Sequence, residues 1–137
     1  MGSLSGTAGR PTLILVHHPP FATGIAHMDS CPMAGAEAFA EIVRRHPNVE
    51  RVVCGHVHRP MTVRWGGTVV STCPSTAHQF ALDLVANSPA SYVLEPPGFQ
   101  LHHWQSPSAL GPSALGHVGL VTHTAPVSVA TPRPLGH

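Results

Sequence analysis

Short runs of hydrophobic residues along the chain predict strands that alternate with one helix. Residues Thr12 to Val16 form a mostly aliphatic run bounded by proline, which is typical of a strand buried on both faces of an α/β sheet. Between Gly35 and His46, apolar residues recur at intervals of three and four, which predicts a helix that ends before Pro47. Residues Arg51 to Cys54 predict a second buried strand.

The pattern after this second strand predicts antiparallel hairpins. Two short strands, Met61 to Trp65 and Thr68 to Thr72, flank the dipeptide Gly66-Gly67, which is a signal for a two-residue turn. Three further strands are expected, at Phe80 to Val85, Ser91 to Leu94 and Phe99 to Trp104. This order predicts an α/β unit that becomes antiparallel towards its end.

Composition divides the chain into three parts. Residues 1–10 are small and polar and are interpreted as a flexible leader. Residues 11–105 hold all the expected elements and form the candidate domain. Residues 106–137 are rich in Pro and Gly and contain the pentapeptide PSALG twice, so we expect a low-complexity, disordered tail.

Charge and cysteine content exclude several functional classes. Charged residues make up 9% of the 137 residues, which argues against a basic nucleic-acid-binding protein. The longest aliphatic run, Leu13 to Val16, is too short to span a membrane or to act as a signal peptide, so we expect a cytoplasmic protein. The cysteines Cys31, Cys54 and Cys73 lack the spacing of a disulfide framework or a thiolate zinc site.

Histidine, with 12 copies, carries most of the candidate chemistry. His17 and His18 follow the first strand, and the sequence Gly55-His56-Val57-His58 follows the second. Ligands of α/β sheets bind at the carboxyl ends of the strands, and neutral imidazole is a good ligand for transition metals. In an extended segment, His56 and His58 would project from the same side and could bind one ion or two neighbouring ions.

Other histidines have simpler interpretations. The pair at 102 and 103 lies beside the expected tail, and we interpret it as structural. His46 is expected to complement the dipole at the end of its helix, and His27 is also expected to be structural. The histidines assigned to the tail, for which no site is expected, are His117, His123 and His137.

Three motifs together resemble the C-terminal half of the calcineurin-like metallophosphoesterases. They are LVHHPP at 15–20, CGHVHRP at 54–60 and STCPSTAHQ at 71–79. The most similar branch contains class III cyclic nucleotide phosphodiesterases and bacterial glycerophosphodiesterases. The resemblance implies a sandwich of two mixed sheets with outer helices, of which this chain would contain only a part.

The resemblance also implies roles for individual residues. His17 and His56 would bind one divalent ion of a pair (Mn, Fe, Zn or Co), and His58 would bind the other. The two ions would activate a hydroxide that attacks the phosphorus of a phosphodiester. His78 would bind the substrate phosphate or assist departure of the leaving group. His18 would orient a ligand rather than bind metal.

The sequence departs from the family pattern, because the D-x-H, G-D and G-N-H-D/E motifs that supply the remaining ligands are absent. Asp29 is the one carboxylate that we expect near the site, and Arg59 either steers an anionic substrate or is a solvated charge. We therefore expect the isolated chain to be inactive or weakly active, with a homo-oligomer or a missing N-terminal half as partner. The alternative is a non-catalytic, histidine-rich fragment that binds a metal or a partner.

Overall fold

The structure is a computed structural model that describes residues 9–106 and 119–128. These residues form two helices and eight strands. The helices are α1 (Ala26–Asp29) and α2 (Ala36–Arg44). The strands are β1 (Thr12–Val16), β2 (Val49–Cys54), β3 (Met61–Trp65), β4 (Thr68–Thr72), β5 (Gln79–Phe80), β6 (Tyr92–Val93), β7 (Gly98–Gln105) and β8 (Gly119–Pro126). The fold is of the mixed α/β class, as predicted, with few helices.

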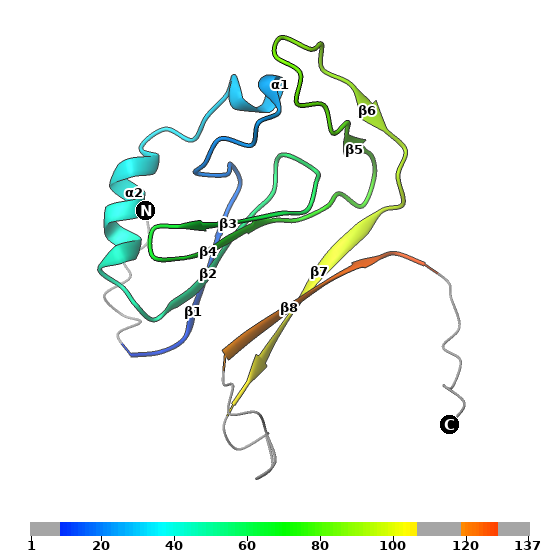
Figure 1. The fold of residues 1–137 in the computed structure, drawn as a ribbon. Coiled ribbons are helices and arrows are strands. Elements are labelled where there is room, and N and C mark those ends of the chain that lie inside the picture. The colour runs from blue at the N-terminus through cyan, green and yellow to red at the C-terminus, as the bar shows by residue number, and fades with distance from the viewer. Residues whose placement is uncertain (1–8, 107–118, 129–137) are drawn as a thin grey trace, which may run out of the picture.

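The central element is a four-stranded mixed sheet with the strand order β1-β2-β4-β3 (Figure 1). Strands β1, β2 and β4 are parallel, whereas β3 and β4 form an antiparallel hairpin. The turn of this hairpin is Gly66-Gly67, and both glycines have a left-handed backbone (φ 58° and 85°) that other residues adopt at a cost. The predicted strands of this sheet and the Gly66-Gly67 turn are therefore confirmed. The prediction that Thr12 to Val16 is buried on both faces is wrong, because β1 lies at the edge of the sheet and contains no fully buried residue.

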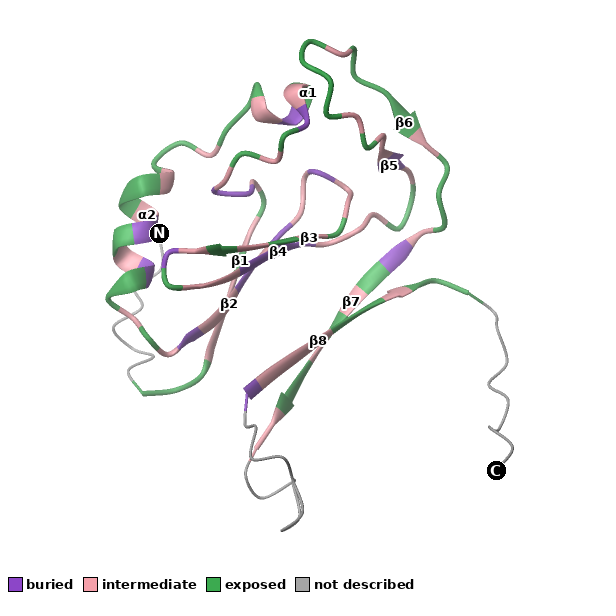
Figure 2. Ribbon diagram, viewed as in Figure 1, coloured by how far each residue is buried: buried purple, intermediate pink, exposed green. Residues whose placement is uncertain are grey.

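Helix α2 covers one face of this sheet. Val43 from the helix packs with Val49, Val52, Cys54 and Val70 from β2 and β4, and all five are buried. In Figure 2 the buried residues gather where α2 faces these strands. The helix is shorter than predicted, because Gly35 stands at its N-cap in the left-handed conformation and the helical hydrogen bonding ends at the C-cap residue Arg45. This packing makes the α2–β2–β4 contact the main hydrophobic core of the described residues.

The long β7–β8 hairpin lies on the opposite side of the sheet from α2 (Figure 1). The Gln100 side chain donates a hydrogen bond to the Thr72 carbonyl oxygen (3.1 Å), which ties β7 to the end of β4. Leu15, on the same side of the sheet, is 73% exposed, so the hairpin covers only part of this face.

The hairpin corrects our prediction of a tail without structure over 106–137. Residues 119–126 form a strand that pairs with β7 along its whole length, from Gly98↔Pro126 to Gln105↔Gly119. Composition suggested disorder, but Leu120, Thr122 and Thr124 alternate with their neighbours and face the same side as Trp104, His102 and Gln100. The expected leader at 1–8, and the tail segments 107–118 and 129–137, lie outside the described residues.

Two other predicted strands are much shorter in the structure. The segments Phe80 to Val85 and Ser91 to Leu94 contribute only β5 and β6, which form a separate two-stranded ribbon. The Asp83 carboxylate accepts a hydrogen bond from the Val85 amide (2.9 Å), and this local turn replaces strand pairing. Leu82 is consequently 66% exposed despite the alternating pattern.

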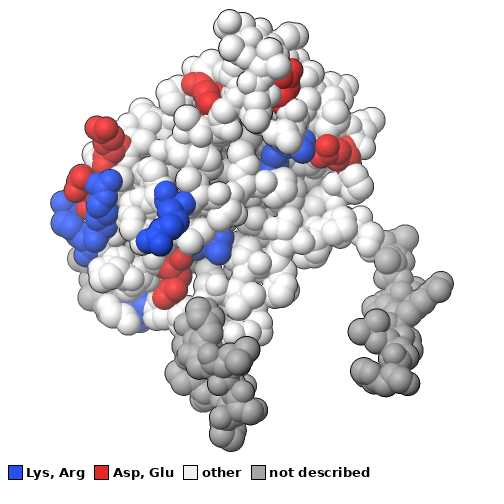
Figure 3. All heavy atoms as spheres, viewed as in Figure 1, with Lys and Arg blue, Asp and Glu red and all other residues white. Residues whose placement is uncertain are grey.

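Charged side chains are few on the molecular surface. The face shown in Figure 3 has scattered charges, and several of them gather over the side on which α2 lies. Among the residues that the structure describes, no helix is long and apolar enough to cross a membrane.

Candidate metal centre

The parallel pairing of β1 and β2 brings the two histidine motifs together. Val16, the last residue of β1, is level with Cys54, the last residue of β2. The chain keeps this register for one more step, since the Gly55 amide donates to the His17 carbonyl oxygen (3.1 Å). His17 and His18 therefore lie beside His56 at the carboxyl edge of the sheet.

Three imidazoles converge at this edge. Each of His17, His18 and His56 offers one ring nitrogen, and these three nitrogens all lie within 4.8 Å of one another. The ring centroids are 4.2 Å apart for His18 and His56, 4.9 Å for His17 and His18, and 5.2 Å for His17 and His56. Within residues 9–106 and 119–128, no carboxylate or thiol belongs to this group. The arrangement fits a divalent transition metal, for which imidazole is a preferred ligand.

The local electrostatics favour the form of His56 that binds metals. Burial lowers the pKa of the His56 imidazole, and the neighbouring His18 and His17 lower it further by charge repulsion. Neutral imidazole has a free electron pair for a metal ion, whereas imidazolium has none. A metal ion at this position would therefore compete with fewer protons than at an ordinary histidine.

The sequence predicts an extended conformation for the motif Gly55-His56-Val57-His58, and this prediction is wrong. His56 and His58 both have a left-handed backbone (φ 66° and 53°), and Val57 between them is fully buried. The two imidazoles consequently belong to different groups of side chains. His58 is not in the cluster of three, and its ring lies against that of His78, with centroids 4.9 Å apart.

A hydrogen bond fixes the tautomer of His58. Its Nδ1 lies 3.1 Å from the backbone carbonyl oxygen of His78, and because a carbonyl can only accept, Nδ1 must carry the proton. The Nε2 atom of neutral His58 then holds the free electron pair. Metal-binding histidines are often oriented in this way by a carbonyl partner. The structure therefore leaves the proposed ligand atom of His58 available.

Arg59 and Asp29 are both engaged in interactions within the chain. The Arg59 guanidinium donates to the Phe80 carbonyl oxygen (2.7 Å) and lies 3.2 Å from a carboxylate oxygen of Glu95. Asp29 accepts hydrogen bonds from the Thr23 amide, the Thr23 hydroxyl and the Gly24 amide. Asp29 thus shapes the loop before α1 and lies outside the histidine cluster. A substrate role for Arg59 stays a prediction.

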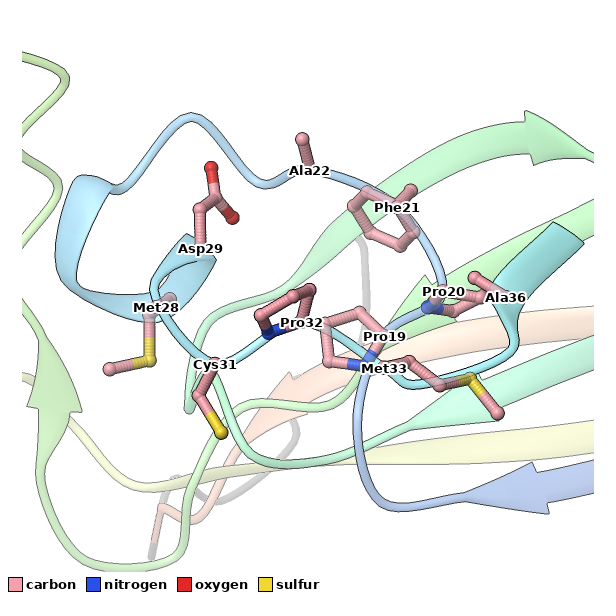
Figure 4. A pocket seen from close by; sticks show the side chains of 10 residues that line it. All are labelled: Pro19, Pro20, Phe21, Ala22, Met28, Asp29, Cys31, Pro32, Met33 and Ala36. Carbon is pink, nitrogen blue, oxygen red and sulfur yellow. The ribbon is translucent and has the colours of Figure 1, made fainter.

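The residues that follow the His17-His18 motif line a cavity of about 150 Å³. Figure 4 shows that it is bounded by the loop after β1, by the residues around α1 and by the start of α2. Its walls are mainly apolar, with Pro19, Phe21 and Met28 among them, and the Asp29 carboxylate is already hydrogen-bonded. The cavity therefore offers no free carboxylate for the missing ligands.

The sequence predicts His17, His56 and His58 at the carboxyl ends of strands, the family resemblance adds His78 near the substrate, and His18 is given no ligand role. The structure brings a ring nitrogen of His18 within 4.8 Å of those of His17 and His56, so His18 belongs to the cluster. Adjacent residues in a strand point to opposite faces, and the chain departs from β geometry directly after Val16, which lets both rings reach His56. The prolines of the HHPP sequence could have indicated this bend, because proline ends the strand.

Comparison with known proteins identifies relatives of this chain, although no protein-family model matches it. It is 38% identical over 117 residues to a probable glycerophosphodiester phosphodiesterase of Arcobacter nitrofigilis, covering 85% of this chain and 39% of the relative. It is 38% identical over 92 residues to a probable cyclic nucleotide phosphodiesterase of Rhodopseudomonas palustris, covering 67% of this chain and 34% of the relative.

A third relative is a 3',5'-cyclic adenosine monophosphate phosphodiesterase of Vibrio vulnificus, which is 46% identical over 77 residues, or 56% of this chain and 28% of the relative. The chain thus spans between 28% and 39% of the lengths of these relatives. The resemblance predicted from the three histidine motifs is confirmed: the chain is homologous to part of the bacterial glycerophosphodiester and cyclic nucleotide phosphodiesterases.

Proposed function

We propose that this chain carries the histidine-rich part of a metal-dependent phosphodiesterase site. The observation that supports this proposal most strongly is the convergence of His17, His18 and His56 at the carboxyl ends of neighbouring parallel strands. The names of the relatives point to phosphodiesters, either cyclic nucleotides or glycerophosphodiesters, as the substrate class. The sheet would belong to a two-sheet sandwich with outer helices, of which this chain supplies one part.

The proposed centre holds two divalent ions. His17 and His56 would hold one ion, with His18 as an additional nitrogen donor or as the residue that orients them, and His58 would hold the other through Nε2. Bound ions of this kind neutralise charge on the phosphoryl oxygens and lower the pKa of water. Carboxylate ligands for such a pair are not among the residues of the cluster, so they would have to come from elsewhere.

The remaining role belongs to His78. Its ring packs against that of His58, and its backbone carbonyl fixes the His58 tautomer. A side chain at this position could donate a hydrogen bond to a phosphate oxygen or pass a proton to the departing alkoxide. We assign His78 these functions of substrate binding and proton transfer.

A second candidate function is metal or partner binding without catalysis. The cluster of three imidazoles without a carboxylate favours this alternative for the isolated chain. Three nitrogens can hold one ion of the zinc type, whereas a dinuclear centre usually needs a bridging ligand.

Metal analysis of the purified chain tests both candidates. We expect a divalent ion such as Zn²⁺ to bind, and we expect His56→Ala to weaken its binding more than tenfold, as measured by competition with a chelating dye. The matched control is His46→Ala, because His46 follows the C-cap residue of α2 and lies outside the cluster. Equal affinities for the two variants would rule out the cluster as the metal site.

Activity separates the two candidates from each other. Mn²⁺-dependent hydrolysis of a bis-aryl phosphate that is abolished by His56→Ala and by His78→Ala supports catalysis. Metal binding through the cluster without turnover supports the binding function for this chain.

A further inference from the structure

The ribbon of β5 and β6 places a series of rings beside the candidate metal centre. His78 and Phe80 lie two residues apart, and Phe80 pairs directly with Tyr92 across the ribbon, so the three rings share one side. The His78 ring is 4.9 Å from that of His58 and 5.3 Å from that of Tyr92, measured between centroids. In Figure 1 this ribbon lies at the edge of the sheet where α1 also lies. The series therefore starts at the proposed metal ligand His58 and ends at Tyr92.

Tyr92 has the exposure that a binding residue needs. It is 65% exposed, although its ring already contacts His78. Exposed aliphatic residues of the neighbouring segment, such as Leu82 at 66%, have no ring with which to stack. Isolated exposed hydrophobic residues are common and need no functional explanation. Tyr92 differs because its ring is held against a residue that we assign to substrate binding.

We propose that Tyr92 is a specificity-determining residue that stacks on the aromatic group of a nucleoside phosphate ester whose phosphate lies beside His78. This inference rests on the proposed function, because the phosphate would lie towards His58 while the base reaches outwards to Tyr92. Flat aromatic groups stack well on tyrosine and histidine rings, and this stacking tolerates different bases. A glycerol ester has no ring to stack, so the site would favour nucleoside esters over glycerophosphodiesters.

The test uses the fact that Tyr92 is the only tyrosine among the 137 residues. Carbon-13 labelling of tyrosine in the full chain gives a single set of ring signals. We would titrate the Zn²⁺-loaded chain with adenosine 5'-monophosphate and, separately, with ribose 5-phosphate, which has the same phosphate but no base. Adenosine monophosphate is expected to shift the Tyr92 ring signals upfield, and ribose 5-phosphate is expected to leave them in place.

Variants separate stacking from a structural role. Removing one stacking ring typically weakens base binding about tenfold, so Tyr92→Leu should raise the Kd for adenosine monophosphate by about that factor. It should leave the Kd for ribose 5-phosphate unchanged, and Tyr92→Phe, which keeps the ring, should behave as the unaltered chain does. Leu82→Ala is the matched control from the same segment and should change neither Kd.

Each contrary result has a distinct meaning. If the unaltered chain binds ribose 5-phosphate as tightly as adenosine monophosphate, the role of Tyr92 is refuted and the proposed function stands. If Tyr92→Leu weakens both ligands equally, Tyr92 only supports His78, and the stacking proposal is refuted. If neither ligand binds and the histidine cluster holds no Zn²⁺, both the inference and the proposed function fail.

Discussion

Val57 holds the two halves of the candidate metal centre in place, and its truncation is the most informative test of that geometry. It is 0% exposed and packs with Ile25 and Met28 in a small cluster of its own. His56 and His58 stand on either side of it and belong to different side-chain groups. The buried valine therefore anchors the loop from which both imidazoles project.

The expected cost of Val57→Ala follows from its burial. The substitution removes the equivalent of two buried methylene groups, each of which contributes about 0.8 kcal/mol. The remaining cavity adds to this loss because the surrounding side chains relax only in part, which brings the total to about 2–3 kcal/mol. With a urea m-value of about 1.5 kcal/mol per M for a chain of this size, the unfolding midpoint should fall by about 1–2 M.

Urea unfolding followed by circular dichroism measures this shift. The matched control is Val85→Ala, the same chemical change at a position that is 67% exposed, for which we expect a change within about 0.5 kcal/mol. A Val57→Ala midpoint equal to that of Val85→Ala would refute the packing described for the loop.

Three further predictions concern protonation, backbone conformation and thiol reactivity. Burial lowers the pKa of both His56 and His102 from the ordinary value of 6.5. As the pH falls through 6.5, these two histidines therefore take up protons in the unfolded chain before they do so in the folded chain. The free energy of unfolding should therefore fall from pH 7.5 to pH 5.5. If this pH dependence is the same in the His102→Gln variant, His102 does not contribute to it. Gly66→Ala forces a side chain into the left-handed turn (φ 58°) and should cost about 1–2 kcal/mol in thermal unfolding, whereas a loss below about 0.5 kcal/mol would argue against the turn. Burial raises the pKa of the Cys54 thiol to about 12, so Ellman's reagent should react with exposed Cys31 first and with Cys54 only after denaturation. Because Cys73 is half-buried, a fast phase in the folded double variant Cys31→Ser/Cys73→Ser would contradict this order.

The central sheet could be predicted from sequence because its signals are local. The aliphatic run in β1 and the Gly66-Gly67 turn between β3 and β4 each specify their element without help from distant residues. The parallel pairing of β1 with β2 then follows from the general rule that strands joined by a helix lie parallel. The proximity of His17 to His56 follows from that pairing.

The rest depends on contacts that a local pattern does not reveal. Strand β8 forms because β7 offers it a partner along eight positions, and composition alone suggested disorder. The strand expected over Phe80 to Val85 is cut short by one side-chain hydrogen bond from the Val85 amide to Asp83. His18 enters the cluster only because the chain turns directly after β1, a bend that alternation along a strand does not predict.

The left-handed backbone at His56 and His58 lowers folding stability at the two positions whose side chains are proposed to bind metal. A residue with a side chain pays about 1 kcal/mol or more for this conformation, which glycine adopts freely and asparagine tolerates well. Selection of random variants for heat resistance alone should therefore enrich glycine or asparagine at these two positions. Each such variant would remove an imidazole from the candidate centre. A more heat-stable form of this chain obtained in that way would be a poorer metal-binding one.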